Sequence, residues 1–223
     1  CLNTYLYVFL FLLPHMDILK LNKKAWNAIG SKAASKTIKD KKYKAAFTLF
    51  CKKLPKHAQV LDLGCGPGLP FTQALVKHNF EVLGIDFSKE MIAAAKKNVP
   101  EATFKMLSMT DIDYKQEFDG IFSGYSMLCL DPKQFKRTAT RITKALKPNG
   151  FLFLSLNEPG PDGHHPRESY IEILRQKLYS RPYTEKEIQK AFPKMKIKYI
   201  DRHLITTKEY GDEHTLIAIL QKT

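Results

Sequence analysis

A short glycine-rich loop constrains the fold of this chain more than any other stretch of its sequence. The loop reads Gly-Cys-Gly-Pro-Gly at residues 64–68, and it directly follows the apolar run Val-Leu-Asp-Leu at residues 60–63. That run has the length and composition of a buried strand rather than of a helix. Glycine tolerates positive φ angles and lets another group approach the backbone closely. The pattern therefore predicts a buried strand that turns sharply into a helix.

The residues beyond the loop complete a strand–loop–helix–strand unit. Apolar side chains recur at helical spacing over residues 69–78, and a second apolar run at residues 82–85 ends at Asp86, which lies 18 residues after Gly68. In such units a ligand lies against the glycine loop, and an acid at the end of the second strand accepts hydrogen bonds from ribose hydroxyls. The sequence therefore predicts a site for the adenosine part of a cofactor.

Asp62, two residues before the loop, bears on which cofactor binds. A nicotinamide dinucleotide places its pyrophosphate over the glycine loop and the following helix N-terminus, where a carboxylate would repel it. Leu69 also stands where the G-x-G-x-x-G motif has its third glycine or alanine. S-adenosyl-L-methionine (SAM) has no phosphate, and its ammonium group gains a charge-assisted hydrogen bond from a nearby carboxylate. The residues favour SAM, and a nicotinamide cofactor is the alternative.

The string Val-Leu-Asp-Leu-Gly-Cys-Gly-Pro-Gly at residues 60–68 resembles the signature loop of class I SAM-dependent methyltransferases, and the resemblance extends over about residues 59–222. It implies an α/β fold with a doubly wound, mostly parallel seven-stranded sheet and an antiparallel C-terminal strand, which is the Rossmann-like methyltransferase fold. It also implies that the protein is an enzyme, with SAM as its cofactor and methyl transfer as its activity.

On this resemblance, cofactor-binding residues lie at the ends of successive strands. Asp62 is expected to hold the ammonium group and Asp86 the ribose hydroxyls. Ser108 stands where the family has an acid that binds the adenine amino group, and Asp111 is the alternative. Met109 is expected either over the adenine or in the core. The expected cofactor-binding residues are Asp62, Gly64, Cys65, Gly66, Gly68, Asp86, Phe87, Met91, Ser108, Met109, Ser123 and Tyr125.

Helical and strand patterns continue along the chain in the order that this fold requires. A capping box with Thr184 as N-cap and Glu187 as the third helical residue predicts a helix start. The final two strands are expected to form an antiparallel hairpin. The other expected elements are a helix from Ser88 to before Pro100, strands at 102–107, 118–127 and 151–156, a helix from Asp131 to the turn at 148–150, a helix at 170–178, and final strands at 196–205 and 215–221.

The chain is expected to have three regions: an apolar extension at residues 1–15, a lysine-rich helical cap at 16–58 and the SAM-binding methyltransferase domain at 59–223. The apolar extension is too short for a membrane helix and lacks the basic start of a signal peptide. We expect it to lie upstream of a start at Met16. The alternative is a short membrane-associating segment, and membrane contact is expected only in that case.

Positive charge is concentrated in the expected cap. The chain has a formal net charge of +14, and residues 16–58 contribute +10 of it through twelve lysines and two aspartates. A solvated helical surface is the favoured interpretation, and an arm that binds nucleic acid is the alternative. The four cysteines form no C-x-x-C pair, which favours reduced thiols and a cytoplasmic protein over a disulfide framework.

The sequence does not assign a catalytic residue. If the acceptor needs a general base, the candidates are Tyr125, Glu158, His164 and His165. The adjacent histidines lie in a loop rich in proline and glycine, and no helix-spaced third ligand accompanies them, so no metal site is predicted.

The expected acceptor is a small molecule. Ser-Gly-Tyr-Ser at residues 123–126 replaces the Asn/Asp-Pro-Pro-Tyr/Phe string of adenine-amine methyltransferases, and no Pro-Cys pair marks a cytosine-C5 nucleophile. The alternatives are an RNA or protein methyltransferase guided by the basic arm, and a protein that binds SAM without catalysis. Neither the acceptor itself nor an oligomeric state follows from the sequence.

Overall fold

The computed structural model describes residues 17–33, 38–160, 169–207 and 211–223. Its centre is a seven-stranded sheet in the order β3-β2-β1-β4-β5-β9-β8, in which β9 is antiparallel to both of its neighbours. The expected doubly wound fold is confirmed. The strands of this sheet are β1 (Gln59–Leu63), β2 (Glu81–Asp86), β3 (Thr103–Met106), β4 (Phe118–Gly124), β5 (Leu146–Asn157), β8 (Met195–Thr207) and β9 (Gly211–Lys222).

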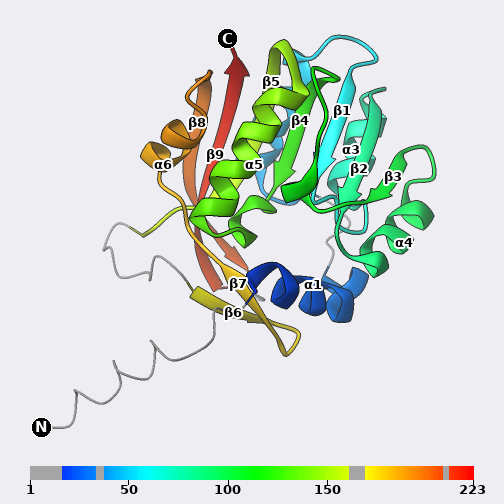
Figure 1. Ribbon diagram of the computed structural model, residues 1–223, viewed down its shortest axis with the longest axis vertical. Coiled ribbons are helices and arrows are strands. Elements are labelled where there is room, and N and C mark those ends of the chain that lie inside the picture. The colour runs from blue at the N-terminus through cyan, green and yellow to red at the C-terminus, as the bar shows by residue number, and fades with distance from the viewer. Residues whose placement is uncertain (1–16, 34–37, 161–168, 208–210) are drawn as a thin grey trace, which may run out of the picture.

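Helices cover both faces of the sheet and one of its ends (Figure 1). On one face lie α5 and α6, and on the other lie α2 and α3. Helix α1 crosses the end at which the parallel strands finish, beside a separate two-stranded hairpin. The helices are α1 (Ile18–Ile29), α2 (Lys41–Lys53), α3 (Phe71–Lys77), α4 (Lys89–Asn98), α5 (Pro132–Ala145) and α6 (Glu185–Ala191), with short 3-10 turns η2 (Gly30–Ala33), η3 (Met109–Asp111) and η4 (Met127–Cys129).

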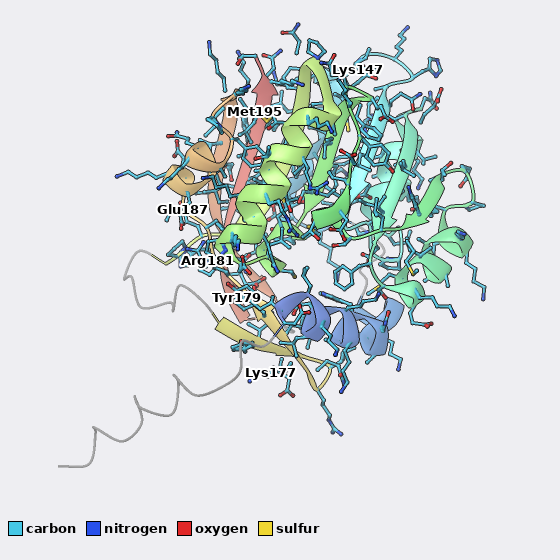
Figure 2. All side chains as sticks on the ribbon, in the orientation of Figure 1. Lys147, Lys177, Tyr179, Arg181, Glu187 and Met195 are labelled. Carbon is cyan, nitrogen blue, oxygen red and sulfur yellow. The ribbon has the colours of Figure 1, made fainter. Side chains whose placement is uncertain are left out.

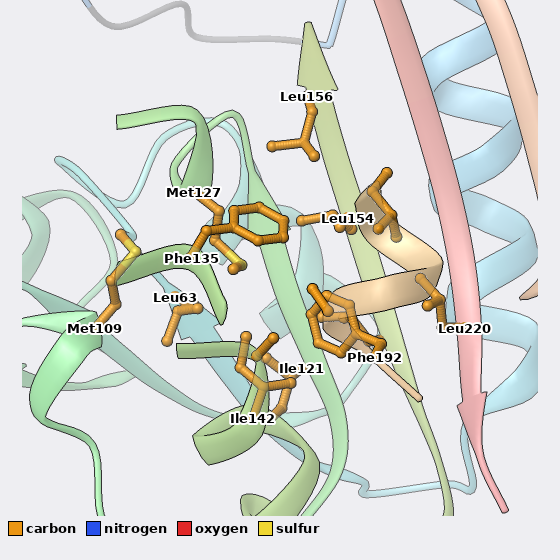
Figure 3. Close-up of a cluster of buried hydrophobic side chains, with 14 of the residues drawn as sticks. Leu63, Met109, Ile121, Met127, Phe135, Ile142, Leu154, Leu156, Phe192 and Leu220 are labelled. Carbon is orange, nitrogen blue, oxygen red and sulfur yellow. The ribbon is translucent and has the colours of Figure 1, made fainter. Parts of the chain in front are cut away.

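Apolar side chains from both faces of the sheet fix these layers. On the α5 face, Phe135 and Phe192 pack with Leu154 and other buried residues of β1, β4, β5 and β9 (Figure 3). On the α2 face, Phe50 and Phe122 are fully buried in a second cluster. Because α2 belongs to this second cluster, the lysine-rich helix is part of the packed protein.

The predicted helix starts are confirmed by their hydrogen bonds. Thr184 and Glu187 form the expected capping box at α6, and Asp131 and Gln134 form one at α5. The side chain of Ser88 caps α4 by accepting a hydrogen bond from the Met91 backbone. Among the described residues, no helix is both long and apolar enough to span a bilayer.

The helix predicted at residues 170–178 is wrong. This segment forms a β-hairpin of β6 (Ser169–Ile173) and β7 (Gln176–Ser180). Leu174 and Arg175 make its two-residue turn with φ angles of 48° and 62°. Such turns need positive φ at both central residues and usually contain Asn-Gly, so the sequence carries no signal for this one.

Several element boundaries also differ from the prediction, and the largest differences are in β4, α5, β5 and β9, which begins at Gly211 instead of residue 215. The fourth strand was expected to reach Met127, but β4 ends at Gly124 and Met127 starts η4. Helix α5 ends at Ala145 rather than at residues 148–150, and β5 begins at Leu146, five residues earlier than expected. A register irregularity between Phe118 and Gly120 accommodates the longer strand.

Candidate active site

The glycine loop is fastened to the neighbouring strand through its own backbone. The N–H groups of Gly64 and Cys65 both donate to the Ile85 carbonyl oxygen, each over 2.9 Å. Gly64 has a φ of +77°, and a Cβ atom placed there would lie 2.5 Å from the Ser126 Cβ atom. Gly66 also has positive φ, but a Cβ atom there would meet nothing within 4 Å. The loop is therefore tightly packed at its base and open at its tip.

Asp86 lies at the end of β2 and is held by the backbone around it. Its Oδ1 atom accepts from the Ser88 N–H over 2.8 Å, and its Oδ2 atom accepts from the Gly66 N–H over 3.1 Å. Burial raises the pKa of Asp86 to about 6, against the lowering effect of these backbone hydrogen bonds. The carboxylate is thus oriented at the open tip of the loop, where ribose hydroxyls are expected.

Asp62 lies at the base of the loop in β1 and is buried, with 2% of its surface exposed. Its Oδ2 atom accepts a hydrogen bond from the Thr72 hydroxyl of α3 over 2.6 Å. Burial raises the pKa of Asp62 to about 7, with a smaller upward contribution from the charge of Asp86, while Thr72 opposes the shift. Two carboxyl groups close enough to interact favour a cationic ligand over a phosphate.

The remaining expected residues line the same edge or support it. The Ser123 hydroxyl bonds the Ser126 hydroxyl at 2.8 Å under the glycine loop. Met109 is buried in the core with its Cε atom near Gly64, so the structure supports the packing interpretation of this side chain. Phe87 is half-buried directly after Asp86, and Met91 is buried in α4.

Ser108 caps η3 instead of presenting a free hydroxyl. Its Oγ atom lies 2.8 Å from the Thr110 hydroxyl and accepts from the Thr110 N–H. Asp111 is exposed and accepts from the same Thr110 hydroxyl over 3.2 Å. The Cys65 side chain packs among Ile92 and other apolar residues beside α4. Only the backbone of Cys65 therefore faces the loop interior.

Tyr125 follows β4 in a left-handed conformation, with a φ of 52°. A tyrosine rarely adopts this conformation, and such outliers concentrate at functional sites. Its N–H donates to the Ser155 hydroxyl, its own hydroxyl lies 3.1 Å from that of Thr215, and its ring stacks on Tyr43 of α2 at 5.6 Å between centroids. Burial raises the pKa of Tyr125, which keeps its hydroxyl protonated at neutral pH.

Helix α1 closes the site through two asparagines that the sequence interpretation missed. Asn22 is buried and donates to the Cys129 and Tyr179 carbonyls, each over 3.1 Å, and it accepts from the Tyr179 N–H over 2.8 Å. At the other end of the helix, Asn27 accepts from the Ser88 hydroxyl over 2.7 Å. Helix α1 is therefore hydrogen-bonded to η4 after β4, to β7, and to Ser88, which lies two residues after Asp86.

Of the other general-base candidates, the structure describes only Glu158. Glu158 is paired with Arg202 over 2.8 Å. His164 and His165 lie outside the described residues. Within the described ranges, no three His, Cys, Asp or Glu side chains form a group that could hold a metal ion. The thiols of Cys51, Cys65 and Cys129 are free and buried.

Comparison with known sequences identifies the same region of the chain. The family described as "Methyltransferase domain" matches residues 60–150. An uncharacterised methyltransferase of Synechocystis is 32% identical over 45% of this chain and 48% of its own length. A trans-aconitate 2-methyltransferase of Variovorax paradoxus is 29% identical over 59% of this chain and 49% of its own length. The chain thus spans about half the length of these curated relatives.

Solved structures share the fold at low sequence identity. A SAM-dependent methyltransferase of Methanosarcina mazei has a TM-score of 0.69 at 19% identity and covers 78% of this chain and 96% of its own. The 1,6-didemethyltoxoflavin-N1-methyltransferase of Burkholderia thailandensis was solved with 1,6-didemethyltoxoflavin and S-adenosylhomocysteine bound. It has a TM-score of 0.64 at 20% identity, and the match covers 83% of this chain and 80% of its own. The loop and the strand order agree with these matches: residues 60–150 match the methyltransferase domain family, and the chain has the fold of class I SAM-dependent methyltransferases.

Proposed function

We propose that this chain binds SAM against the glycine loop and transfers its methyl group to a small molecule. The observation that carries the proposal is the pair of carboxyl groups, buried Asp62 and half-buried Asp86, on either side of a loop whose tip is open at Gly66. In this assignment Asp62 receives the ammonium group of SAM and Asp86 its ribose hydroxyls. A dinucleotide phosphate would meet two negative charges at the same place.

The residues expected from the sequence form the remainder of this proposed site. The backbone of Gly64, Cys65, Gly66 and Gly68 permits close approach of the cofactor. The sheet edge at Ser123 and Tyr125 faces the position where the methyl group would be presented. We assign the adenine contact to Phe87, Met91 and the Ser108 turn, and Met109 supports the loop from the core.

Methyl transfer places modest chemical demands on the protein. When bound, SAM supplies an activated methyl group that a nucleophile attacks in line. The chain then has to align the acceptor and exclude water, and alignment alone is worth up to roughly 7–11 kcal/mol. Tyr125 is suited to orienting an acceptor, because its ring and hydroxyl are fixed by Tyr43 and Thr215. No general base is assigned.

A small acceptor fits the enclosure of the site. Helix α1 crosses the carboxyl edge of the sheet and is bonded through Asn22 to Cys129 and Tyr179. A macromolecular substrate would have to displace this helix. Two of the matched proteins, which act by their names on trans-aconitate and on 1,6-didemethyltoxoflavin, support a small acceptor for this chain as well.

A macromolecular acceptor is the second candidate, and one surface favours it. Lys41, Lys44 and Lys52 line a shallow hollow on the outer face of α2. Such a lysine stripe would attract a phosphate backbone in a salt-dependent manner. The regions proposed from the sequence, a cap at residues 16–58 and a catalytic domain at 59–223, would then divide binding from chemistry.

Transfer of a radiolabelled methyl group distinguishes these proposals. The protein is incubated with labelled SAM and either a small-molecule extract or total RNA and protein. We expect label in the small-molecule extract and its suppression by S-adenosylhomocysteine. Label only in the macromolecular fraction would establish the second candidate. Cofactor binding without transfer to any fraction would mean a SAM-binding protein without catalysis.

A further inference from the structure

Arg181 is a buried cation with hydrogen-bond donors to spare. It follows β7 and has 6% of its surface exposed. Its Nη2 atom donates to Glu187 Oε1 over 2.6 Å. Among the described residues, its Nε and Nη1 atoms make no hydrogen bond of good geometry, and the nearby Tyr183 side chain contributes to raising the pKa of Arg181. Burial lowers the pKa of Arg181, but the adjacent Glu187 carboxylate raises it further, so the guanidinium stays charged.

Its position is fixed at the edge of the sheet where ligands bind in this fold. The Arg181 N–H donates to the Leu128 carbonyl in η4 over 2.9 Å, and the Tyr183 N–H donates to the carbonyl of Asn157, the last residue of β5, over 2.8 Å. Arg181 thus lies beyond the carboxyl ends of β4 and β5, between Tyr179 of β7 and Glu187 of α6 (Figure 2).

The guanidinium is held in one orientation. Its Cζ atom lies 4.4 Å from the centroid of the Tyr183 ring, and that ring is itself stacked on Phe135 at 4.1 Å. Glu187 fixes Nη2 on the side of α6. Because Nη1 is on the other branch of the planar group, it points away from Glu187. A guanidinium packed on an aromatic ring is pre-organised for a planar anion.

Leaving these donors unpaired is costly. A buried donor without a partner costs about 1–3 kcal/mol, and native proteins contain few of them. A second buried atom at the same edge is also without a partner within the described residues: Oδ1 of Asn157, whose amide nitrogen donates to Glu213. Unpaired donors and an unpaired acceptor at the same edge of the sheet indicate a polar ligand.

We propose that Arg181 binds a carboxylate group of the methyl acceptor, so that the acceptor is a small organic acid. The inference rests on the proposed function, because it names the substrate class of the same site. Arginine binds carboxylates through charge-assisted hydrogen bonds, and the unpaired Nη1 atom of Arg181 can donate one to the carboxylate of the acceptor. Asn157 Oδ1 then accepts from a hydroxyl or amine of the same molecule.

The test divides a small-molecule extract on an anion exchanger before the reaction. Wild-type protein is incubated with labelled SAM and either the retained, acidic fraction or the unretained fraction. We expect methyl incorporation with the acidic fraction. Incorporation only with the unretained fraction would overturn the proposal while leaving the proposed function intact. Incorporation with neither fraction would contradict the proposed function itself. This arm needs no variant and does not depend on one folding.

The second arm compares Arg181→Lys with Arg141→Lys. Arg141 is a half-buried arginine of α5 that donates to the Ile112 carbonyl, so it is a matched control. Arg181→Lys keeps the charge but loses the planar donor set, and we expect the rate with the acidic fraction at low acceptor concentration to fall about tenfold or more. Arg141→Lys should leave it unchanged. Both should bind S-adenosylhomocysteine as the wild type does.

Two results of the second arm would overturn the assignment. An Arg181→Lys rate equal to the wild-type rate would show that the guanidinium does not bind the acceptor. Loss of S-adenosylhomocysteine affinity in Arg181→Lys, with Arg141→Lys unaffected, would place Arg181 in the cofactor site instead.

Discussion

The hydroxyl of Thr72 donates a hydrogen bond of 2.6 Å to the carboxyl group of Asp62, and both residues are buried. The contact joins the first turn of α3 to the last residues of β1, on both sides of the glycine loop. It supplies the ionised carboxylate with a donor in a place where burial disfavours charge. Thr72 therefore controls the charge of the residue that we assign to the ammonium group of SAM.

Replacing Thr72 with valine should weaken cofactor binding in a pH-dependent way. Loss of the hydroxyl removes the interaction that lowers the pKa of Asp62, so the pKa rises above about 7. A rise of one pKa unit would lower the ionised fraction of Asp62 at pH 7 from about one half to about one tenth, so we expect about fivefold weaker binding at pH 7 with recovery near pH 8.5. Calorimetric titration with S-adenosylhomocysteine at both pH values measures this.

Thr140→Val is the control, because Thr140 bonds only the Lys136 carbonyl on the exposed side of α5. It should bind the cofactor as the wild type does. An equal loss of affinity at both pH values in Thr72→Val would show that the threonine acts through packing alone.

The pH dependence of the wild type follows from the same two carboxyl groups. In the folded state the pKa of Asp62 is about 7 and that of Asp86 about 6, both above the usual value near 3.8. Their contribution to folding is therefore most favourable below pH 4 and is lost as the pH rises through 6 to 7. Cofactor binding needs the ionised forms, so its affinity should rise over the same range and release protons at pH 6.

Titrations in buffers of different ionisation enthalpy count those protons. Asp62→Asn serves as the reference, because it removes one of the two titrating groups and should show a weaker rise of affinity with pH. An affinity that is constant from pH 5.5 to 8 in the wild type would contradict the assignment of these carboxylates to the cofactor.

Substitution by alanine should have different effects on stability and on cofactor binding at two glycines of the loop, Gly64 and Gly66. In Gly64→Ala the new Cβ atom would lie 2.5 Å from the Ser126 Cβ atom, so the variant should be strongly destabilised. In Gly66→Ala the Cβ atom meets no protein atom within 4 Å, and only the positive φ is penalised, by about 1–2 kcal/mol.

The methyl group of Gly66→Ala would instead occupy the space that we assign to the cofactor. Chemical denaturation and cofactor titration of both variants test this contrast. We expect a larger loss of unfolding free energy in Gly64→Ala, and in Gly66→Ala a loss of affinity that exceeds its loss of stability. Undiminished binding by Gly66→Ala would place the cofactor elsewhere.

Asn22→Ala should loosen the helix that closes the site. The substitution removes the hydrogen bonds of Asn22 with the N–H and carbonyl of Tyr179 and with the carbonyl of Cys129, and losing the partner of a buried polar group costs about 1–3 kcal/mol. We expect lower thermal stability and faster hydrogen exchange in α1. Gln189→Ala, which removes an exposed amide contact to Glu185, is the control. Unchanged exchange in α1 would show that Asn22 does not hold it.

Local patterns in the sequence predicted most of the fold and the centre of the site. The glycine loop, Asp62 and Asp86 fall within one short unit whose geometry depends on neighbouring residues. The capping boxes at Asp131 and Thr184 are equally local. The β6–β7 hairpin was missed because its turn uses Leu174 and Arg175 in place of glycine or asparagine.

The rest of the site depends on contacts between distant parts of the chain. Asn22 bonds residues 107 and 157 positions away, and nothing beside it in the sequence indicates this. The exposure and pairing of Arg181 likewise depend on η4 and α6. Tyr125 was expected at the site, but its left-handed backbone became evident only in the structure.

Calorimetric titration of the wild type and of Asp86→Asn with S-adenosylhomocysteine tests the central claim most directly. The asparagine keeps an oxygen for the Ser88 N–H but loses one charged acceptor for the ribose. The account predicts one site per chain in the wild type and a loss of about 1.5–3 kcal/mol in the variant, with Asp113→Asn unchanged. Absence of binding heat in the wild type, or equal affinity in Asp86→Asn, would contradict it.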